Sequence, residues 1–156
     1  MHGRLLIKLG IFVALSGAIT IVAMPMRAQA HHSFAMYDQT KDVTMTGRLI
    51  RFIPGGNHAQ LIFEVLDSSG EAKLDASGDP VIWGVETGPS ATIAQEGITV
   101  KSFPLGTVLT VTLNPLRDGR PFGALARDSS IIKCGTAMPK QGCAAETGES
   151  FLGLRD

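Results

Sequence analysis

The stretch VTMTGRLIRF, from Val43 to Phe52, has the pattern of a long β-strand that bends. Val43 and Met45 alternate with threonines, which is the two-residue period of a strand with one apolar face. Gly47 interrupts this alternation, and a glycine inside a strand often marks a bulge or a bend. Because the long first strand of a small barrel must curve to serve both of its sheets, this stretch favours a β-barrel.

Four more strands are expected along the chain, each short, rich in β-branched residues and separated from the next by Gly, Pro, Asn or Asp. Three of them fall in the segments 60–70, 80–86 and 107–113, and the segment FGALARDSSII, 122–132, is a weaker fifth strand. The alternating apolar faces predict the side chains that lie inside the barrel: Phe63, Val65, Val85, Leu109 and Val111.

One short helix is expected between the third and fourth strands, in TGPSATIAQEG. Pro89 suits the start of a helix because it has no N–H to leave unbonded, and Gly97 can end the helix in the left-handed conformation. Three strands, a short helix and two strands is the order of an OB-like barrel. The predicted fold is therefore all-β with one short helix, a small five-stranded OB-like barrel, and a β-sandwich is the alternative.

Residues 1–30 have the features of a secretory signal peptide. A positively charged start precedes an uncharged apolar run from Leu9 to Met24, and Ala28-Gln29-Ala30 provides small residues for a peptidase. The run is shorter than the roughly 20 residues that span a bilayer, which disfavours the alternative of an uncleaved membrane anchor. We expect cleavage after Ala30, a mature chain from His31, and a periplasmic or secreted location without membrane attachment.

The mature chain would be mildly acidic. Removal of residues 1–30 from the 156 leaves 11 Lys and Arg against 14 Asp and Glu, a formal net charge of −3. General nucleic-acid binding needs a basic surface that neutralises phosphates, so nucleic acid is not an expected partner. Neither a nucleophile elbow nor a phosphate loop nor a dinucleotide fingerprint occurs, so no enzyme class is indicated.

The barrel is expected in residues 31–133 and a C-terminal tail in residues 134–156. From Gly142 onward the tail is rich in Gly and Glu and is expected to be loosely held apart from a disulfide. Cys134 and Cys143 are the two cysteines, and export to an oxidising compartment favours their pairing. A metal-binding pair is the alternative, although the spacing is not that of a C-x-x-C site.

Four phrases of the chain occur in a characteristic order: AHHSFAMYD, VTMTGRL followed by NH, WGVETGPSATIAQEG, and LGTVLTVTLNPLRDGRPFGAL. Together they resemble a family of small exported bacterial proteins of unknown function, whose members begin, after the leader, with His-His-Ser-Phe. The resemblance covers about residues 30–130 and implies export and a small β-rich domain. The family usually has Asn-Pro-His where this chain has Gly56-Asn57-His58, and the cysteine segment looks like an addition. The resemblance brings no established activity.

The histidines of the mature chain lie at its start and in one loop: His31, His32 and His58. If cleavage exposes the α-amine of His31, this amine and the imidazole of the same residue can chelate one metal ion. His58, between the first two strands, would add a nitrogen across the fold to complete a histidine brace. Imidazole ligands suit copper, zinc and nickel, and tetragonal nitrogen sites favour Cu(II). His32 or the thioether of Met36 could add a further ligand.

This ligand set resembles, at the site alone, the brace of copper-dependent polysaccharide oxygenases and of some periplasmic copper carriers. Cleavage one residue earlier would instead create the start Ala30-His31-His32, which can bind Cu(II) or Ni(II) through its amine, two amides and the third-position imidazole. The alternative to both is that the histidines are merely solvated, since the first residues of a domain are often disordered.

A second candidate cluster lies in NPLRDGRPFG, where Asp118-Gly119 marks the turn between the fourth and fifth strands. Arg117 and Arg120 flank this turn and could hold a carboxylate or a phosphate. In an OB-like barrel this loop and the loop of His58 lie beside the same ligand face. The alternative is a solvated hairpin with flanking charges.

Trp83 and Glu86 fall in the third strand. Trp83 alternates with Val81 and Val85, which favours a core position over a stacking platform for a sugar or a base. Glu86 could be a buried acid, a partner that orients a histidine ligand, or a solvent-facing strand end.

The leading hypothesis is an exported binding protein that takes copper or another transition metal through His31 and His58, with no other cofactor. The alternative is a non-metal module that binds an anionic solute or a glycan through Arg117 and Arg120. A copper-dependent oxidative enzyme ranks third, because no surface platform of aromatic side chains for a polymer is visible.

Overall fold

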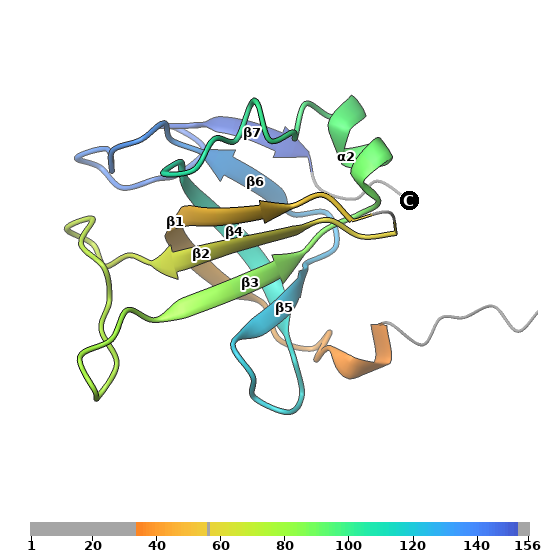
Figure 1. Ribbon diagram of the computed structural model, residues 1–156, viewed down its shortest axis with the longest axis horizontal. Coiled ribbons are helices and arrows are strands. Elements are labelled where there is room, and N and C mark those ends of the chain that lie inside the picture. Colours follow the sequence, from red (N-terminus) through yellow and green to blue (C-terminus); the bar gives the residue numbers. More distant parts are fainter. Residues whose placement is uncertain (1–33, 56, 153–156) are drawn as a thin grey trace, which may run out of the picture. The chain divides into compact units, whose positions relative to one another are not determined.

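The computed structural model describes residues 34–55 and 57–152, and its strand β1, Val43–Ile53, pairs with two different strands (Figure 1). The first half of β1 pairs antiparallel with β4, Val108–Pro115, and the second half pairs antiparallel with β2, Gln60–Val65. One strand therefore serves both sides of the structure, as its sequence predicts.

The two pairings of β1 overlap at Gly47 and Arg48, and Gly47 lies opposite Val65 on β2 and Leu109 on β4. A Cβ atom at Gly47 would lie 2.3 Å from a ring carbon of Phe63, so only glycine lets the strands approach this closely. The irregular step in the register follows between Leu49 and Arg51. The close crossing and the bulge are thus neighbouring but separate features of β1.

Strands β3, Ile82–Glu86, and β5, Phe122–Leu125, complete the ring. The strand order is β1-β2-β3-β5-β4, with β3 parallel to β5, and the pairing of β4 with β1 closes the barrel. The helix α2, Ser90–Gln95, follows Pro89 and precedes Gly97 between β3 and β4. The predicted OB-like barrel with one short helix between strands three and four is confirmed.

Two further strands extend the sheet beyond the barrel: β6, Ser130–Lys133, which pairs with the start of β4, and β7, Glu149–Leu152, which pairs with β6 (Figure 1). The predicted fifth strand, 122–132, is therefore two strands. Asp128, with φ 57°, lies in the turn between them. This turn moves the chain from the end of β4 to its beginning.

The prediction of a loosely held tail is wrong for the residues up to 152. The ring of Phe151 on β7 packs edge-on against that of Phe103, with centroids 4.9 Å apart. The predicted disulfide between Cys134 and Cys143 is confirmed, and Cys143 is buried against Leu66 and Val108. Apolar contacts as well as the disulfide therefore attach the tail to the barrel.

The interior of the barrel contains the side chains expected there. Four of the five predicted core residues are fully buried, namely Phe63, Val85, Leu109 and Val111. Val65, at the end of β2, is half-buried and packs against the same cluster. Full burial of such a side chain stabilises a fold by about 1.5–3 kcal/mol, so this alternation is enough to set the strand register.

Candidate functional site

His58 lies between β1 and β2, in a segment that hydrogen bonds tie to the residues after β3. The amide of Ala59 donates to the carbonyl of Gly88 (3.0 Å), and the amide of Thr87 donates to the carbonyl of Ala59 (2.8 Å). The hydroxyl of Thr87 also donates to the Ala59 carbonyl, at 3.1 Å. Backbone pairing therefore holds His58 against the end of β3.

The ring of His58 faces two oxygen atoms from this end of β3. Its Nδ1 lies 3.0 Å from the carbonyl oxygen of Thr87 and 3.6 Å from Oε1 of Glu86. A carbonyl oxygen only accepts hydrogen bonds, so in the neutral ring Nδ1 carries the proton and Nε2 keeps its lone pair. The side chain is 33% exposed. An imidazole held in this tautomer can offer Nε2 to a metal ion.

Glu86 connects His58 to Tyr37, a residue that the sequence analysis did not single out. The Tyr37 hydroxyl donates a hydrogen bond to the Glu86 carboxylate, whose side chain is 18% exposed. Burial of Tyr37, together with the charge and hydrogen bonding of Glu86, raises the pKa of the phenol to about 12. The chain Tyr37–Glu86–His58 links the N-terminal segment to the segment between β1 and β2.

Tyr37 reaches Glu86 because its ring is anchored in a small apolar cluster. The ring packs with Leu116, Ala124 and Phe122, and the residue is 1% exposed. A signal for this role exists in the sequence, since Tyr37 is the only tyrosine of the chain and a buried phenol generally requires a hydrogen-bond partner. The identity of that partner depends on the fold.

The short 3₁₀ helix η1, Phe34–Met36, precedes Tyr37 and lies beside the β4–β5 hairpin (Figure 1). Met36, a predicted additional ligand, is 47% exposed. His31 and His32, the predicted N-terminal ligands, lie outside the described residues. The described part of the chain begins at Phe34, three residues after His31, and its first residues lie beside the β4–β5 hairpin.

Arg117 and Arg120 extend from the β4–β5 hairpin, and each already faces a carboxylate. Nε of Arg120 donates to Oδ2 of Asp118 at 2.8 Å, and hydrogen bonds from Arg120 lower the pKa of Asp118. Arg117 Nη1 lies 3.8 Å from Oδ1 of Asp38, and its Nε donates to the carbonyl of Ala35 at 3.3 Å. The two guanidinium groups thus contact different partners.

Trp83 lies opposite Phe63 in the pairing of β2 with β3 and packs, half-buried, against the main core. This placement accords with the core role that its alternation with Val81 and Val85 predicts.

Within residues 34–55 and 57–152, no group of three or more His, Cys, Asp and Glu side chains is close enough together to hold a metal ion. In the same described part of the chain, no helix is long and apolar enough to cross a membrane.

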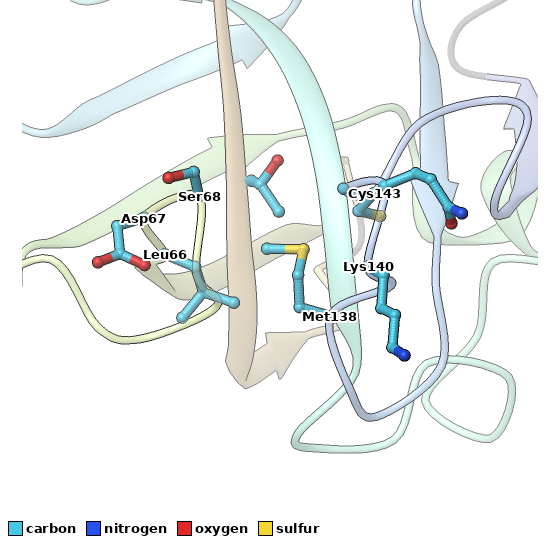
Figure 2. Close-up of a pocket in the computed structure, with 9 residues that line it drawn as sticks. Leu66, Asp67, Ser68, Met138, Lys140 and Cys143 are labelled. Atoms are coloured by element: carbon cyan, nitrogen blue, oxygen red, sulfur yellow. The ribbon is translucent and has the colours of Figure 1, made fainter.

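A cleft of about 400 Å³ lies at the other end of β2 from His58, between the turn after β2 and the disulfide loop (Figure 2). Figure 2 shows Met138 between Leu66 on one side and Lys140 and Cys143 on the other. Asp67, in the same turn, uses Oδ1 to accept hydrogen bonds from the residues that follow it. This cleft is separate from the His58 site.

Fold and site together define a small OB-like barrel protein in which a tyrosine, a glutamate and a histidine connect the N-terminal segment to the loop after β1. The chain belongs to a family of unknown function, DUF6152, whose profile matches residues 18–125. The matched region includes His31, Tyr37, His58 and Glu86 and ends before the disulfide. No curated protein and no solved structure matches the chain.

Proposed function

We propose that this chain is an exported, periplasmic or secreted protein that binds a late transition metal, with copper the best fit, through His31 and His58. The observation that carries the proposal is the orientation of His58. Its Nδ1 contacts the Thr87 carbonyl and lies near Glu86, which favours the tautomer with a lone pair on Nε2. Metal-binding histidines commonly have such a partner on the other ring nitrogen.

The position of the N-terminal segment supports the participation of His31. Tyr37 touches Glu86, the carboxylate that lies beside His58, so the chain enters the fold next to this site. His31 precedes Phe34 by three residues, and three residues span at most about 10 Å when extended. The amine and imidazole of His31 would then join Nε2 of His58 in a three-nitrogen set, which suits Cu(II).

Export is part of the proposal because cleavage after Ala30 creates the ligand. Before cleavage His31 has only a backbone amide, which does not bind metal as an amine does. The exposed thioether of Met36 could add a softer ligand, of the kind that suits Cu(I).

The other two hypotheses have less support. An anion-binding pair is disfavoured because Asp38 and Asp118 already face Arg117 and Arg120. An oxidative reaction at the metal would need a site for its substrate, and no observation favours one.

The test is a calorimetric Cu(II) titration of the mature chain and its variants. We expect His58→Ala and His31→Ala each to weaken binding at least about tenfold, or ~1.4 kcal/mol, because each removes an imidazole ligand. Asn57→Ala is the matched control, since Asn57 is the exposed neighbour of His58 in the same segment. Affinities of the histidine variants equal to that of the control would overturn the proposal.

A further inference from the structure

We propose that the cleft between the turn after β2 and the disulfide loop, residues 134–143, binds a short zwitterion with an apolar middle, of which a dipeptide is the best fit. Asp67 would bind the ammonium group of this ligand, and Lys140 would bind its carboxylate. The cleft lies at the other end of β2 from His58, so this inference is independent of the proposed metal site.

The two walls of the cleft come from different parts of the chain. One wall lies in the barrel, inside the region that matches the family, and includes Thr46, Leu66 and Asp67. The other lies in the extension after β5 and includes Met138 and Cys143. The volume, about 400 Å³, is within the usual range of small-molecule sites, about 300–1,000 Å³. The extension therefore supplies a wall that the family-matched region alone lacks.

The turn that forms the first wall is fixed by hydrogen bonds. Oδ1 of Asp67 accepts from the amide of Ser69 at 2.8 Å, from the hydroxyl of Ser69 at 2.6 Å and from the amide of Glu71 at 3.1 Å. Nη2 of Arg48 donates to the carbonyl of Gly70 at 3.2 Å. This wall is therefore formed before a ligand binds.

The disulfide loop that forms the second wall is fixed as well. In addition to the disulfide, the hydroxyl of Thr110 donates to the carbonyl of Cys143 at 2.7 Å. The amide of Gly142 donates to the carbonyl of Pro139 at 2.9 Å. Two walls that are already ordered reduce the entropic cost of binding a small ligand.

Apolar side chains line the middle of the cleft. Leu66 and Cys143 are buried, and Met138 packs against the same cluster. Met138 can lie close to the turn because Gly70 has no side chain, and a Cβ atom there would be 2.8 Å from the Cβ of Met138. This middle suits the aliphatic side chains of a ligand.

The two walls also carry opposite charges. Hydrogen bonding, above all from the Ser69 hydroxyl, lowers the pKa of Asp67, so its carboxylate is ionised at neutral pH. These hydrogen bonds use Oδ1, which leaves Oδ2 for an ammonium group. Lys140 is exposed and has no ion-pair partner within the part of the chain that the structure describes. A ligand with both charges complements this arrangement.

The separation of the charges favours a dipeptide over a single amino acid. Figure 2 shows Asp67 and Lys140 on opposite sides of Met138. In an amino acid both charged groups are attached to one carbon, whereas the ends of an extended dipeptide lie up to about 7 Å apart. The flexible stem of a lysine can follow the carboxylate.

The test is an NMR titration of the chain with the dipeptide Leu-Leu, with its N-acetyl form, which lacks the ammonium group, and with its C-terminal amide, which lacks the carboxylate. We expect saturable shifts of the Ser68 and Gly142 amides at millimolar concentrations of the free dipeptide. Asp67→Asn and Lys140→Gln should each weaken its binding about threefold, the modest effect of an exposed ion pair.

The modified ligands assign each charge to its residue. Asp67→Asn should have little effect on binding of the N-acetyl form, and Lys140→Gln should have little effect on binding of the amide. Asp75→Asn is the matched control for Asp67, because Asp75 accepts equivalent hydrogen bonds in a second turn outside the cleft. Lys101→Gln, at another exposed lysine outside the cleft, is the control for Lys140.

Absence of saturable shifts in the native chain would overturn the proposal. Equal affinity for the three ligands would also overturn it, because the charges would then make no contact. The same conclusion would follow if the control substitutions weakened binding as much as Asp67→Asn and Lys140→Gln.

Discussion

Tyr37 shows at the scale of one residue how this chain joins distant segments. Its ring belongs to the cluster of Leu116 and Ala124, and its hydroxyl reaches Glu86 at the end of β3. One side chain thus combines apolar anchoring with a polar contact to the carboxylate beside His58. An amphipathic aromatic residue is well suited to this double role.

We expect the phenol of Tyr37 to titrate at about 12, well above its ordinary value of 10.0. Because the folded chain keeps a proton that the unfolded chain has lost, stability should be fully present below pH 10 and fall as the pH rises toward 12. Tyr37 is the only tyrosine, so the ultraviolet absorbance of phenolate reports this group alone. The Tyr37→Phe variant provides the baseline, and a folded chain that titrates near 10 would contradict the assignment.

At the same scale, the sequence indicates part of the candidate site. The paired histidines His31 and His32, the single loop histidine His58, and Glu86 can be identified from residue type and position. The Tyr37–Glu86 contact could not, because it depends on how segments 49 residues apart in the sequence come together. The charge of Arg117 is visible in the sequence, whereas the Ala35 carbonyl and Asp38 that it contacts are brought to it by the fold.

At the scale of secondary-structure elements, β1 depends on a glycine at its crossing point. An added methyl group at Gly47 would lie 2.3 Å from a ring carbon of Phe63 and 2.7 Å from the Glu64 carbonyl oxygen. Both neighbours are held by the β1–β2 pairing, since Phe63 is fully buried and Glu64 pairs with Arg48. The strand therefore has little freedom to accommodate a side chain there.

We expect Gly47→Ala to lower the free energy of unfolding by about 1–3 kcal/mol, the usual effect of overpacking a well-packed position. Chemical denaturation measures it. Arg51→Ala is the control, because Arg51 is an exposed residue of the same strand and should change stability by less than about 0.5 kcal/mol. Equal stability of Gly47→Ala and the native chain would mean that the close crossing of β1 is misplaced.

The first four strands were more predictable than the division of the last predicted strand into two. Alternation and turn residues locate β1 to β4, because a one-residue slip would turn every apolar side chain outward. The split of 122–132 into β5 and β6 was missed. Asp128 and Ser129 are turn-forming residues inside FGALARDSSII, but the sequence does not show that its two halves pair with different ends of β4.

At the scale of the whole molecule, the family match and the fold divide the chain in the same way. The match ends at residue 125, the last residue of β5, where the closed barrel is complete. β6, β7 and the disulfide follow, and Cys143 and Phe151 attach this extension to the barrel. The barrel and the proposed metal ligands belong to the matched part, whereas the extension begins with β6, which pairs with the start of β4.

The measurement that tests the central claim most directly compares two chains that differ by one residue at the N-terminus. One starts at His31, and the other carries an additional Met before it. Both keep His31, His32 and His58, so only the α-amine of His31 is changed. We predict that calorimetry finds Cu(II) binding at least about tenfold weaker, or ~1.4 kcal/mol, in the extended chain. Equal affinities would contradict the account, because the amine that cleavage exposes would then not be a ligand.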